Sequence, residues 1–155
     1  LSNDSSILQS ADKLILPGVG NYARAMSKIN GLNLSSTIRH LVLNEKKPIL
    51  GICLGMQLMN ELEGGTVSAY YPPVHGKTSA LESTNLNFNQ QRVGRYHSLK
   101  CHVPATFHVL ATSEQLPMII QHKSKNWLGL QFHPESFLTE NSDLYLQAAV
   151  DICSR

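Results

Sequence analysis

The distribution of apolar residues divides the chain into two parts of different character. In the first part, the short apolar runs 12–16 and 48–52 predict buried strands, and residues with helical spacing follow each of them. Helices are predicted at residues 21–29, 35–44 and 54–62. This alternation of strand and helix is typical of an α/β fold.

The second part of the chain predicts short strands separated by turn residues. These strands are expected at residues 66–71, 92–96, 107–112, 118–122 and 127–132. The polar segment 83–91 predicts a loop, and Asn141 or Ser142 is suited to cap a final helix that ends near Cys153. Together the two parts predict one α/β domain with a mixed sheet, over residues 1–155.

Composition then excludes several classes of function. The chain has 155 residues, and its formal charge of +2 gives no reason to expect binding to nucleic acid or to an anionic membrane. No apolar run reaches the ~20 residues of a membrane-spanning helix, and no signal peptide is recognisable. The three cysteines include no C-x-x-C pair, which favours a reducing, cytoplasmic location over a disulfide framework or a zinc site.

A candidate nucleophile lies between the second predicted strand and the helix that follows it. Gly51-Ile52-Cys53-Leu54-Gly55 has small residues two positions before and after a central thiol, as in the G-x-S-x-G elbow of serine hydrolases. In such a turn the helix N-terminus favours a thiolate, and the Leu54 N–H points toward a developing oxyanion. From this pentapeptide alone, a buried structural cysteine between two turn glycines is an equally good interpretation.

A candidate base follows the last predicted strand. In Gln131-Phe132-His133-Pro134-Glu135, the histidine is placed at a strand's carboxyl edge, and Glu135 is near enough in sequence to orient its imidazole. A thiol nucleophile needs such a base, and the base needs such an orienting group. Taken by itself, the segment fits a surface turn with a solvated carboxylate better.

Three segments in this order resemble the signatures of class I glutamine amidotransferases of the triad type. Leu16-Pro17-Gly18-Val19-Gly20 resembles the family's oxyanion strand, residues 51–57 resemble its nucleophile elbow, and residues 131–136 resemble its histidine motif. The resemblance runs over nearly the whole chain. It implies a flavodoxin-like fold with a mixed, mostly parallel sheet flanked by helices.

The resemblance also implies a reaction and a site. Cys53 would attack the side-chain amide of glutamine, His133 would carry the proton to the departing ammonia, and Glu135 would orient His133. The implied contacts with glutamine and the oxyanion are Gly18, Val19, Gly20, Leu54, Gln57, Ser98 and Leu99. Ammonia would pass to a synthase subunit or fused domain, and the glutaminase half-reaction would need neither a cofactor nor a metal.

The sequence resembles two branches of the family that differ in their synthase partner. Segments 74–79, 93–99 and 135–140 resemble the glutaminase subunits of anthranilate and aminodeoxychorismate synthases, which use chorismate. Segment 17–26 and Met56 resemble instead the glutaminase subunit of imidazole glycerol phosphate synthase. Because the second half carries the partner-facing loop and the glutamine clamp in this family, we favour a chorismate-using partner. Imidazole glycerol phosphate synthase is the alternative, and another acceptor, such as a sugar, stays open.

The beginning of the chain departs from the family pattern. Only 16 residues precede Pro17, so the usual first strand, which would neighbour the elbow strand, is expected to be missing or to come from elsewhere. Its absence would leave two apolar strand edges exposed.

Two interpretations from other classes also stay open. The first is a cysteine hydrolase with the same order of residues, and the second is a non-catalytic scaffold protein. Gln57 and segment 95–99 argue against the hydrolase because they match a clamp for free glutamine. The intact Cys53, His133 and Glu135 argue against the scaffold.

Overall fold

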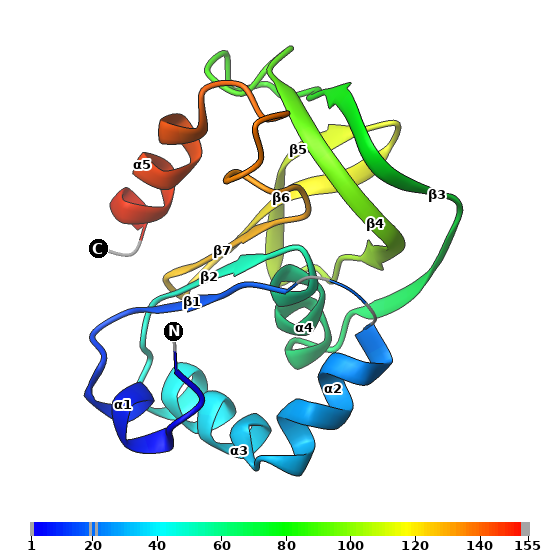
Figure 1. Cartoon of the computed structure of the whole chain (residues 1–155). Coiled ribbons are helices and arrows are strands. Elements are labelled where there is room, and N and C mark those ends of the chain that lie inside the picture. The colour runs from blue at the N-terminus through cyan, green and yellow to red at the C-terminus, as the bar shows by residue number, and fades with distance from the viewer. Residues whose placement is uncertain (1, 19, 21, 153–155) are drawn as a thin grey trace.

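The core of the protein is a five-stranded mixed sheet with helices on both faces (Figure 1). The computed structural model describes residues 2–18, 20 and 22–152, and the structural statements below concern these residues. The sheet consists of β1 (Leu14–Leu16), β2 (Ile49–Ile52), β5 (Phe107–Ser113), β6 (Leu116–His122) and β7 (Trp127–Leu130). The helical segments are α1 (Ser5–Ser10), α2 (Tyr22–Gly31), α3 (Leu34–Arg39), the π-helical turn η1 (His40–Asn44), α4 (Leu54–Leu62) and α5 (Ser142–Ile152).

The strand order in this sheet is β1-β2-β7-β6-β5. The pairings β1–β2 and β2–β7 are parallel, and the pairings β6–β7 and β5–β6 are antiparallel. The predicted mixed α/β sheet is therefore confirmed, although parallel pairing makes up half of the described sheet and not most of it.

The elbow strand β2 lies inside the sheet, with β1 on one side and β7 on the other. Of the two apolar strand edges expected to be exposed, neither therefore borders this strand. Among the described strands the edge is formed by β1, where the Ile15 side chain is 64% exposed. Only this short strand carries the cost of an open edge on that side of the described sheet.

The two faces of the sheet bury different sets of side chains, because successive residues of a strand point in opposite directions. Leu50 and Leu128 belong to the apolar cluster that includes residues of α5. Ile49 and Trp127 belong to the cluster that includes residues of α3, η1 and α4. Helix α5 therefore covers one face, and α3 and α4 cover the other (Figure 1).

Glycines in the two central strands let α4 lie close to the sheet. A Cβ atom on Gly51 would lie 2.6 Å from the carbonyl carbon of Gly55, and one on Gly129 would lie 2.9 Å from Cγ of Met56. Both distances are far shorter than a normal carbon–carbon contact of about 3.5–4.0 Å. The missing side chains thus bring the N-terminus of α4 directly onto the end of β2.

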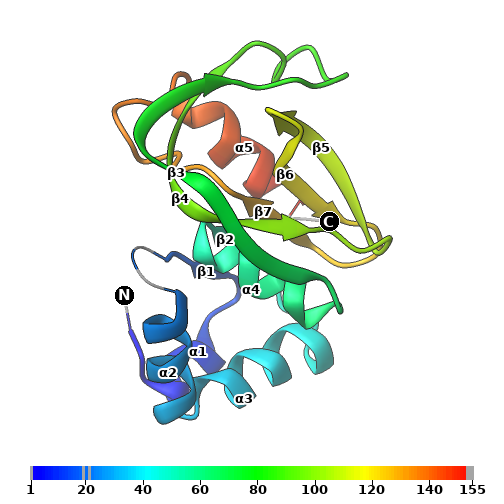
Figure 2. The same cartoon turned by 90° about the vertical axis from the view of Figure 1, so that its right-hand side faces the viewer.

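A separate two-stranded antiparallel ribbon is formed by β3 (Thr66–Ala80) and β4 (Arg92–His102). Figure 2 shows β3 crossing in front of β4 on the side of the molecule away from α5. Both strands extend well beyond the predicted segments 66–71 and 92–96. The pairing register shifts between Ala69 and Val74, a segment that contains two prolines without an N–H for strand pairing.

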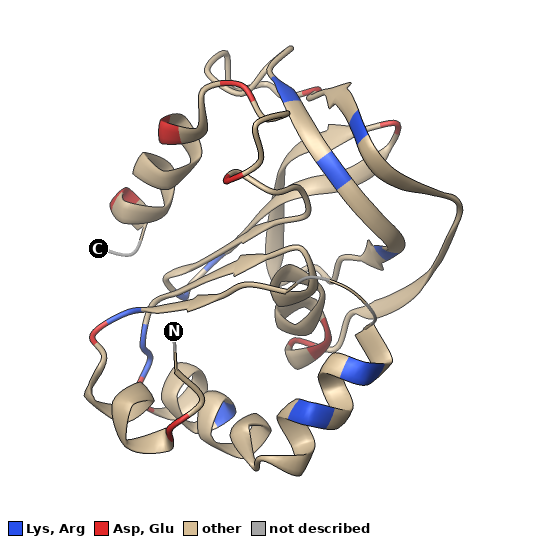
Figure 3. Ribbon diagram, in the orientation of Figure 1, with Lys and Arg blue, Asp and Glu red and all other residues tan. Residues whose placement is uncertain are grey.

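The remaining predicted elements agree with the structure to within a few residues, and the loop 83–91 is confirmed. The predicted helix 35–44 is divided into α3 and η1, and α1 was not predicted. None of the described helices is long and apolar enough to cross a lipid bilayer. Basic residues on α2 and the β3–β4 ribbon and acidic residues on α5 and near the end of α4 are visible in Figure 3, and further charged residues of both signs lie on other segments.

Candidate active site

Cys53 lies at the turn that joins β2 to α4, where the pentapeptide predicts a nucleophile elbow. Its backbone has φ 54° and ψ −104°, a conformation that costs a non-glycine residue free energy and recurs at functional sites. The Cys53 N–H donates to the Leu130 carbonyl at 2.7 Å, and the Gln57 N–H donates to the Cys53 carbonyl at 3.2 Å. A Cβ atom on Gly55 would collide with the Leu16 carbonyl oxygen. The turn is therefore held by strands on both sides of β2.

Burial determines the protonation state of the Cys53 thiol. The side chain is buried, and this burial raises the pKa to about 11, although the Leu54 N–H acts in the opposite direction. The negative charge of Glu135 adds to the increase. The helix N-terminus therefore favours the thiolate in the expected direction, but burial outweighs it and keeps the thiol protonated in the resting protein. A base has to remove the proton before this sulfur can act as a nucleophile.

His133 and Glu135 form a hydrogen-bonded pair just after β7. The distance from His133 Nδ1 to Glu135 Oε1 is 2.6 Å, so the carboxylate accepts a hydrogen bond from the Nδ1–H group. The imidazole side chain is 6% exposed, whereas the Glu135 side chain is 60% exposed. The solvated carboxylate expected for a plain surface turn is thus present, but it also fixes the tautomer that leaves Nε2 free of a proton.

Three residues that the sequence analysis did not single out hold His133 in place. Its N–H donates to the Gly94 carbonyl at 3.2 Å, and its own carbonyl accepts the Thr139 hydroxyl at 2.6 Å. The Tyr96 ring lies edge-on to the imidazole with 5.5 Å between ring centroids, and its hydroxyl is 3.0 Å from the Ser136 hydroxyl. The base is therefore positioned by β4 as well as by its own segment.

Two buried glutamine side chains, hydrogen-bonded to each other, lie near the thiol. Gln57 Nε2 donates to Gln131 Oε1 at 3.2 Å, and Gln131 Nε2 lies 3.7 Å from the Cys53 sulfur. Gln57, expected to contact substrate, lines the cavity and also donates to Gln131, and its contact with substrate stays a prediction. The sequence contains only one signal for Gln131, namely its position two residues before His133 in the segment that follows β7.

A cavity of about 810 Å³ brings most of the predicted site residues together. The predicted residues that line it are Gly20, Cys53, Leu54, Gln57, Ser98, Leu99, His133 and Glu135. Gly18 lies against Leu54, because a Cβ atom there would collide with the Leu54 Cβ. Gly20 has φ 95°, which favours glycine. Val19, predicted to contribute to the oxyanion site, lies outside the described residues.

The other titratable groups of the described segments form no second centre of this kind. Cys101 is free and buried, and burial raises the pKa of its thiol to about 12. Among the described residues, no group of three or more histidine, cysteine, aspartate or glutamate side chains is arranged to hold a metal ion.

A mixed α/β sheet with a thiol at a strand-to-helix turn, facing the same cavity as a histidine–carboxylate pair, defines the class of triad-type thiol enzymes. The family model described as "Glutamine amidotransferase class-I" matches residues 2–152, and the chain belongs to this family. The family inferred from the three sequence segments is thereby confirmed.

Similar proteins support the same assignment. The chain is 37% identical to the imidazole glycerol phosphate synthase subunit HisH of Staphylococcus aureus strain Mu50, over 96% of this chain and 82% of the relative. It is 34% identical to the same subunit of Mannheimia succiniciproducens, over 87% and 78% of the two chains. The protein is therefore a glutamine amidotransferase of the glutaminase-subunit kind.

Two solved structures share the fold. A protein from Thermoplasma acidophilum, described as a GMP synthase subunit, superposes with a TM-score of 0.81 at 24% identity, over 97% of this chain and 77% of that chain. A glutamine amidotransferase from Thermotoga maritima superposes with a TM-score of 0.68 at 22% identity, over 93% and 64%. These likenesses confirm the α/β fold.

Proposed function

We propose that this protein hydrolyses glutamine at Cys53 and supplies the ammonia to a synthase partner. The observation that carries the proposal is the shared cavity, which Cys53, His133 and Glu135 all line while Glu135 holds the imidazole at 2.6 Å. Proton transfer is essential here, because a thiol with a pKa of about 11 remains protonated at neutral pH.

In the first half of the reaction, His133 Nε2 takes the thiol proton and the sulfur of Cys53 attacks the side-chain amide carbon of glutamine. The Leu54 N–H stabilises the oxygen that becomes negatively charged. His133 then gives its proton to the amide nitrogen, the carbon–nitrogen bond breaks, and ammonia leaves. A glutamyl thioester on Cys53 remains.

In the second half, water attacks the thioester carbon while His133 removes a proton from it. The carbon–sulfur bond breaks, glutamate leaves, and His133 returns the proton to the sulfur. Glutamine and water are consumed, and glutamate and ammonia are formed. Glu135 stays ionised throughout and stabilises the imidazolium that forms in each half.

For the partner, the comparisons support imidazole glycerol phosphate synthase, the branch that the sequence analysis placed second. The Staphylococcus aureus relative belongs to imidazole glycerol phosphate synthase, and the match covers 96% of this chain, including the second half. We therefore take a synthase of this type as the ammonia acceptor, ahead of a chorismate-using synthase.

The chorismate-type partner stays the second candidate because of the ribbon. The segments 74–79 and 93–99, which resemble that branch, pair with each other in β3 and β4, with His75 opposite Tyr96 and Ser79 opposite Val93. His75 and Tyr96 both line the cavity. The two segments thus form one structural unit beside the site.

The test is glutamate release from glutamine by the protein alone, with an imidazole glycerol phosphate cyclase, and with a chorismate-using synthase. We expect stimulation by the cyclase and complete loss of release in Cys53→Ala. Cys101→Ala is the matched control, because it removes a buried thiol that does not line the cavity. Stimulation by the chorismate-using synthase alone would select the second candidate, and release that survives Cys53→Ala would refute the mechanism.

A further inference from the structure

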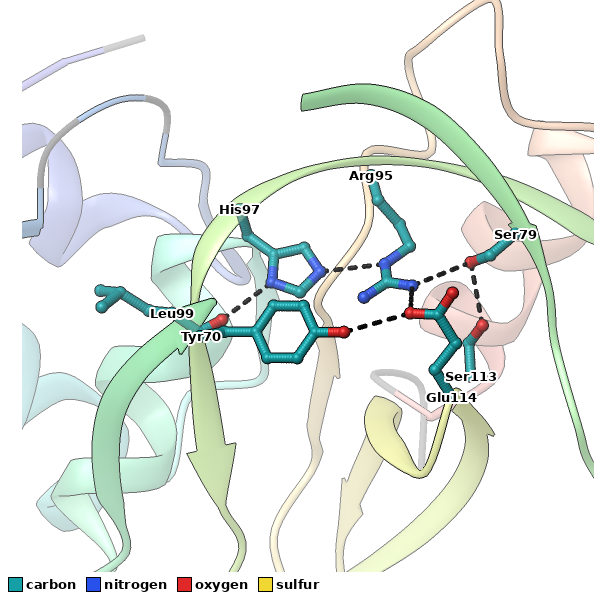
Figure 4. A network of polar contacts seen from close by, with 7 residues as sticks. All are labelled: Tyr70, Ser79, Arg95, His97, Leu99, Ser113 and Glu114. Carbon is teal, nitrogen blue, oxygen red and sulfur yellow. Dashed lines mark hydrogen bonds and ion pairs between the residues drawn. The ribbon is translucent and has the colours of Figure 1, made fainter. Parts of the chain in front are cut away.

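A polar network links the main sheet to one wall of the cavity (Figure 4). At its centre, the Arg95 side chain on β4 is 1% exposed. Arg95 Nη1 is 2.9 Å from Glu114 Oε2 and donates to the Ser79 hydroxyl at 3.4 Å. Glu114 lies in the turn between β5 and β6, so this ion pair ties the ribbon to the sheet.

The same guanidinium fixes the tautomer of His97. Arg95 Nε donates to His97 Nε2 at 3.1 Å, so Nε2 carries no proton. His97 Nδ1 must then carry it, and donates to the Leu99 carbonyl at 2.8 Å. Burial lowers the pKa of His97 to about 4, and the positive charge of Arg95 acts in the same direction. The imidazole is therefore neutral at physiological pH.

Through these bonds the network ends at the cavity. His97, Ser98 and Leu99 line the same cavity as Tyr96 and Cys53. The Tyr70 ring stacks on His97 with 6.0 Å between centroids, and its hydroxyl donates to Glu114 at 3.2 Å. The imidazole is thus held in its plane as well as in its tautomer.

Stability alone is a poor reason for this arrangement. A buried charge costs free energy unless every donor is satisfied, and Arg95 Nη2 is buried without a partner. Only a planar guanidinium can donate along Nε to one partner and along Nη1 to another at fixed angles. The geometry is that of a group that orients its neighbour.

We propose that Arg95 is a positioning residue for glutamine: by holding His97 as the Nδ1–H tautomer, it fixes the Leu99 carbonyl and the cavity wall that faces the substrate. The inference rests on the proposed function, since it takes glutamine as the molecule in the cavity. It assigns Arg95 a role in substrate binding, and leaves proton transfer to His133.

The first experiment measures the imidazole of His97 directly. Long-range ¹H–¹⁵N correlation spectra give the tautomer of each histidine, and His97→Asn identifies the signals of His97. We expect Nδ1–H in the wild type and loss of that single tautomer in Arg95→Met. A wild-type imidazole protonated on Nε2 would overturn the proposal.

The second experiment measures glutamine binding without turnover, by calorimetry in the Cys53→Ala background. Loss of one oriented hydrogen bond corresponds to about a 5- to 10-fold rise in Kd, which we expect for Arg95→Met, with a smaller rise for Glu114→Gln. Glu114→Gln keeps an acceptor oxygen for Arg95 Nη1 and changes a side chain that is 59% exposed, so it alters the packing less than Arg95→Met does. Glu45→Gln is the matched control, because it removes an exposed carboxylate paired with Lys47 away from the ribbon. Unchanged Kd in Glu114→Gln and Arg95→Met would overturn the proposal.

Steady-state kinetics of the partner-stimulated enzyme then separate the two proposals. We expect Arg95→Met to raise KM for glutamine about 5- to 10-fold and to change kcat by less than about 3-fold. A fall in kcat with unchanged KM would contradict the positioning role. If the wild type binds glutamine but releases no glutamate with any partner, the proposed function fails, while the binding comparison still decides the role of Arg95.

Discussion

Gly51→Ala tests whether the close contact between α4 and β2 creates the nucleophile elbow. The new Cβ atom would lie 2.6 Å from the carbonyl carbon and 2.8 Å from the carbonyl oxygen of Gly55, and it would also meet the Met59 sulfur. The flexible Met59 side chain can turn away, but the Gly55 backbone cannot. Helix α4 must therefore move outward by about 1 Å to restore normal contacts.

The expected cost follows from this displacement. Overpacking a rigid core site costs about 1–3 kcal/mol, and we expect a value near 3 kcal/mol because the clash is with backbone. For a domain of this size, that corresponds to a fall in Tm of about 6–12 °C. Cys53 is attached to the helix that moves, and a misplacement of about 1 Å at a reacting group lowers turnover by about 10²-fold.

The assay combines urea denaturation with glutamate release in the presence of the synthase partner. Gly31→Ala is the matched control, since no atom lies within 4 Å of its new Cβ at the end of α2. Alanine should stabilise that position by up to about 1 kcal/mol. If the free energy of unfolding of Gly51→Ala is within about 0.5 kcal/mol of the wild-type value and the variant keeps full activity, α4 does not pack on β2 as described.

Three further predictions concern single groups of the site. The free energy of unfolding should fall by about 3 kcal/mol as the pH drops from 6.5 to about 4, because the unfolded chain binds a proton at His97 that the folded protein excludes. Urea titrations at several pH values measure this, and the dependence of the free energy on pH should be shallower in His97→Gln. Iodoacetamide labelling of Cys53 without partner should accelerate tenfold per pH unit up to about 11, and a plateau below pH 8 would show a preformed thiolate. Thr139→Val should lower both stability, by about 2 kcal/mol, and kcat, because its hydroxyl joins the His133 carbonyl to the Gly94 N–H; Thr139→Ser should restore both, and full activity of the valine variant would contradict this role.

The parts of the fold that the sequence predicts are those with local signals. Helix α4 spans Leu54–Leu62 as predicted, because helical spacing marks its course and a glycine pair follows it. Helix α1 has no buried residue and therefore no apolar stripe to detect. Strand β3 continues past Pro72 and Pro73, since its partner β4 supplies pairing that propensity does not reveal.

The same distinction holds for the site. The elbow around Cys53 and the contact between His133 and Glu135 follow from short motifs. Gly51 and Gly55 are four positions apart, and His133 and Glu135 are two apart, so these contacts form within one short segment of chain. The elevated pKa of Cys53 depends on burial by residues far away in the chain, which no motif contains. The ion pair of Arg95 with Glu114 joins strand β4 of the ribbon to the β5–β6 turn of the main sheet, so only the tertiary structure shows it.

The pairing of β2 with β7 bears on when the protein acquires its reactive centre during synthesis. The Cys53 N–H needs the Leu130 carbonyl, and β2 is aligned through pairs such as Ile49 with Trp127. A ribosome makes the thiol long before it makes its partner strand, and non-local parallel pairing forms slowly. A nascent chain that still lacks β7 therefore cannot hold Cys53 in the conformation of the elbow. The nascent protein is therefore expected to hydrolyse no glutamine until translation has passed β7 and the following His133.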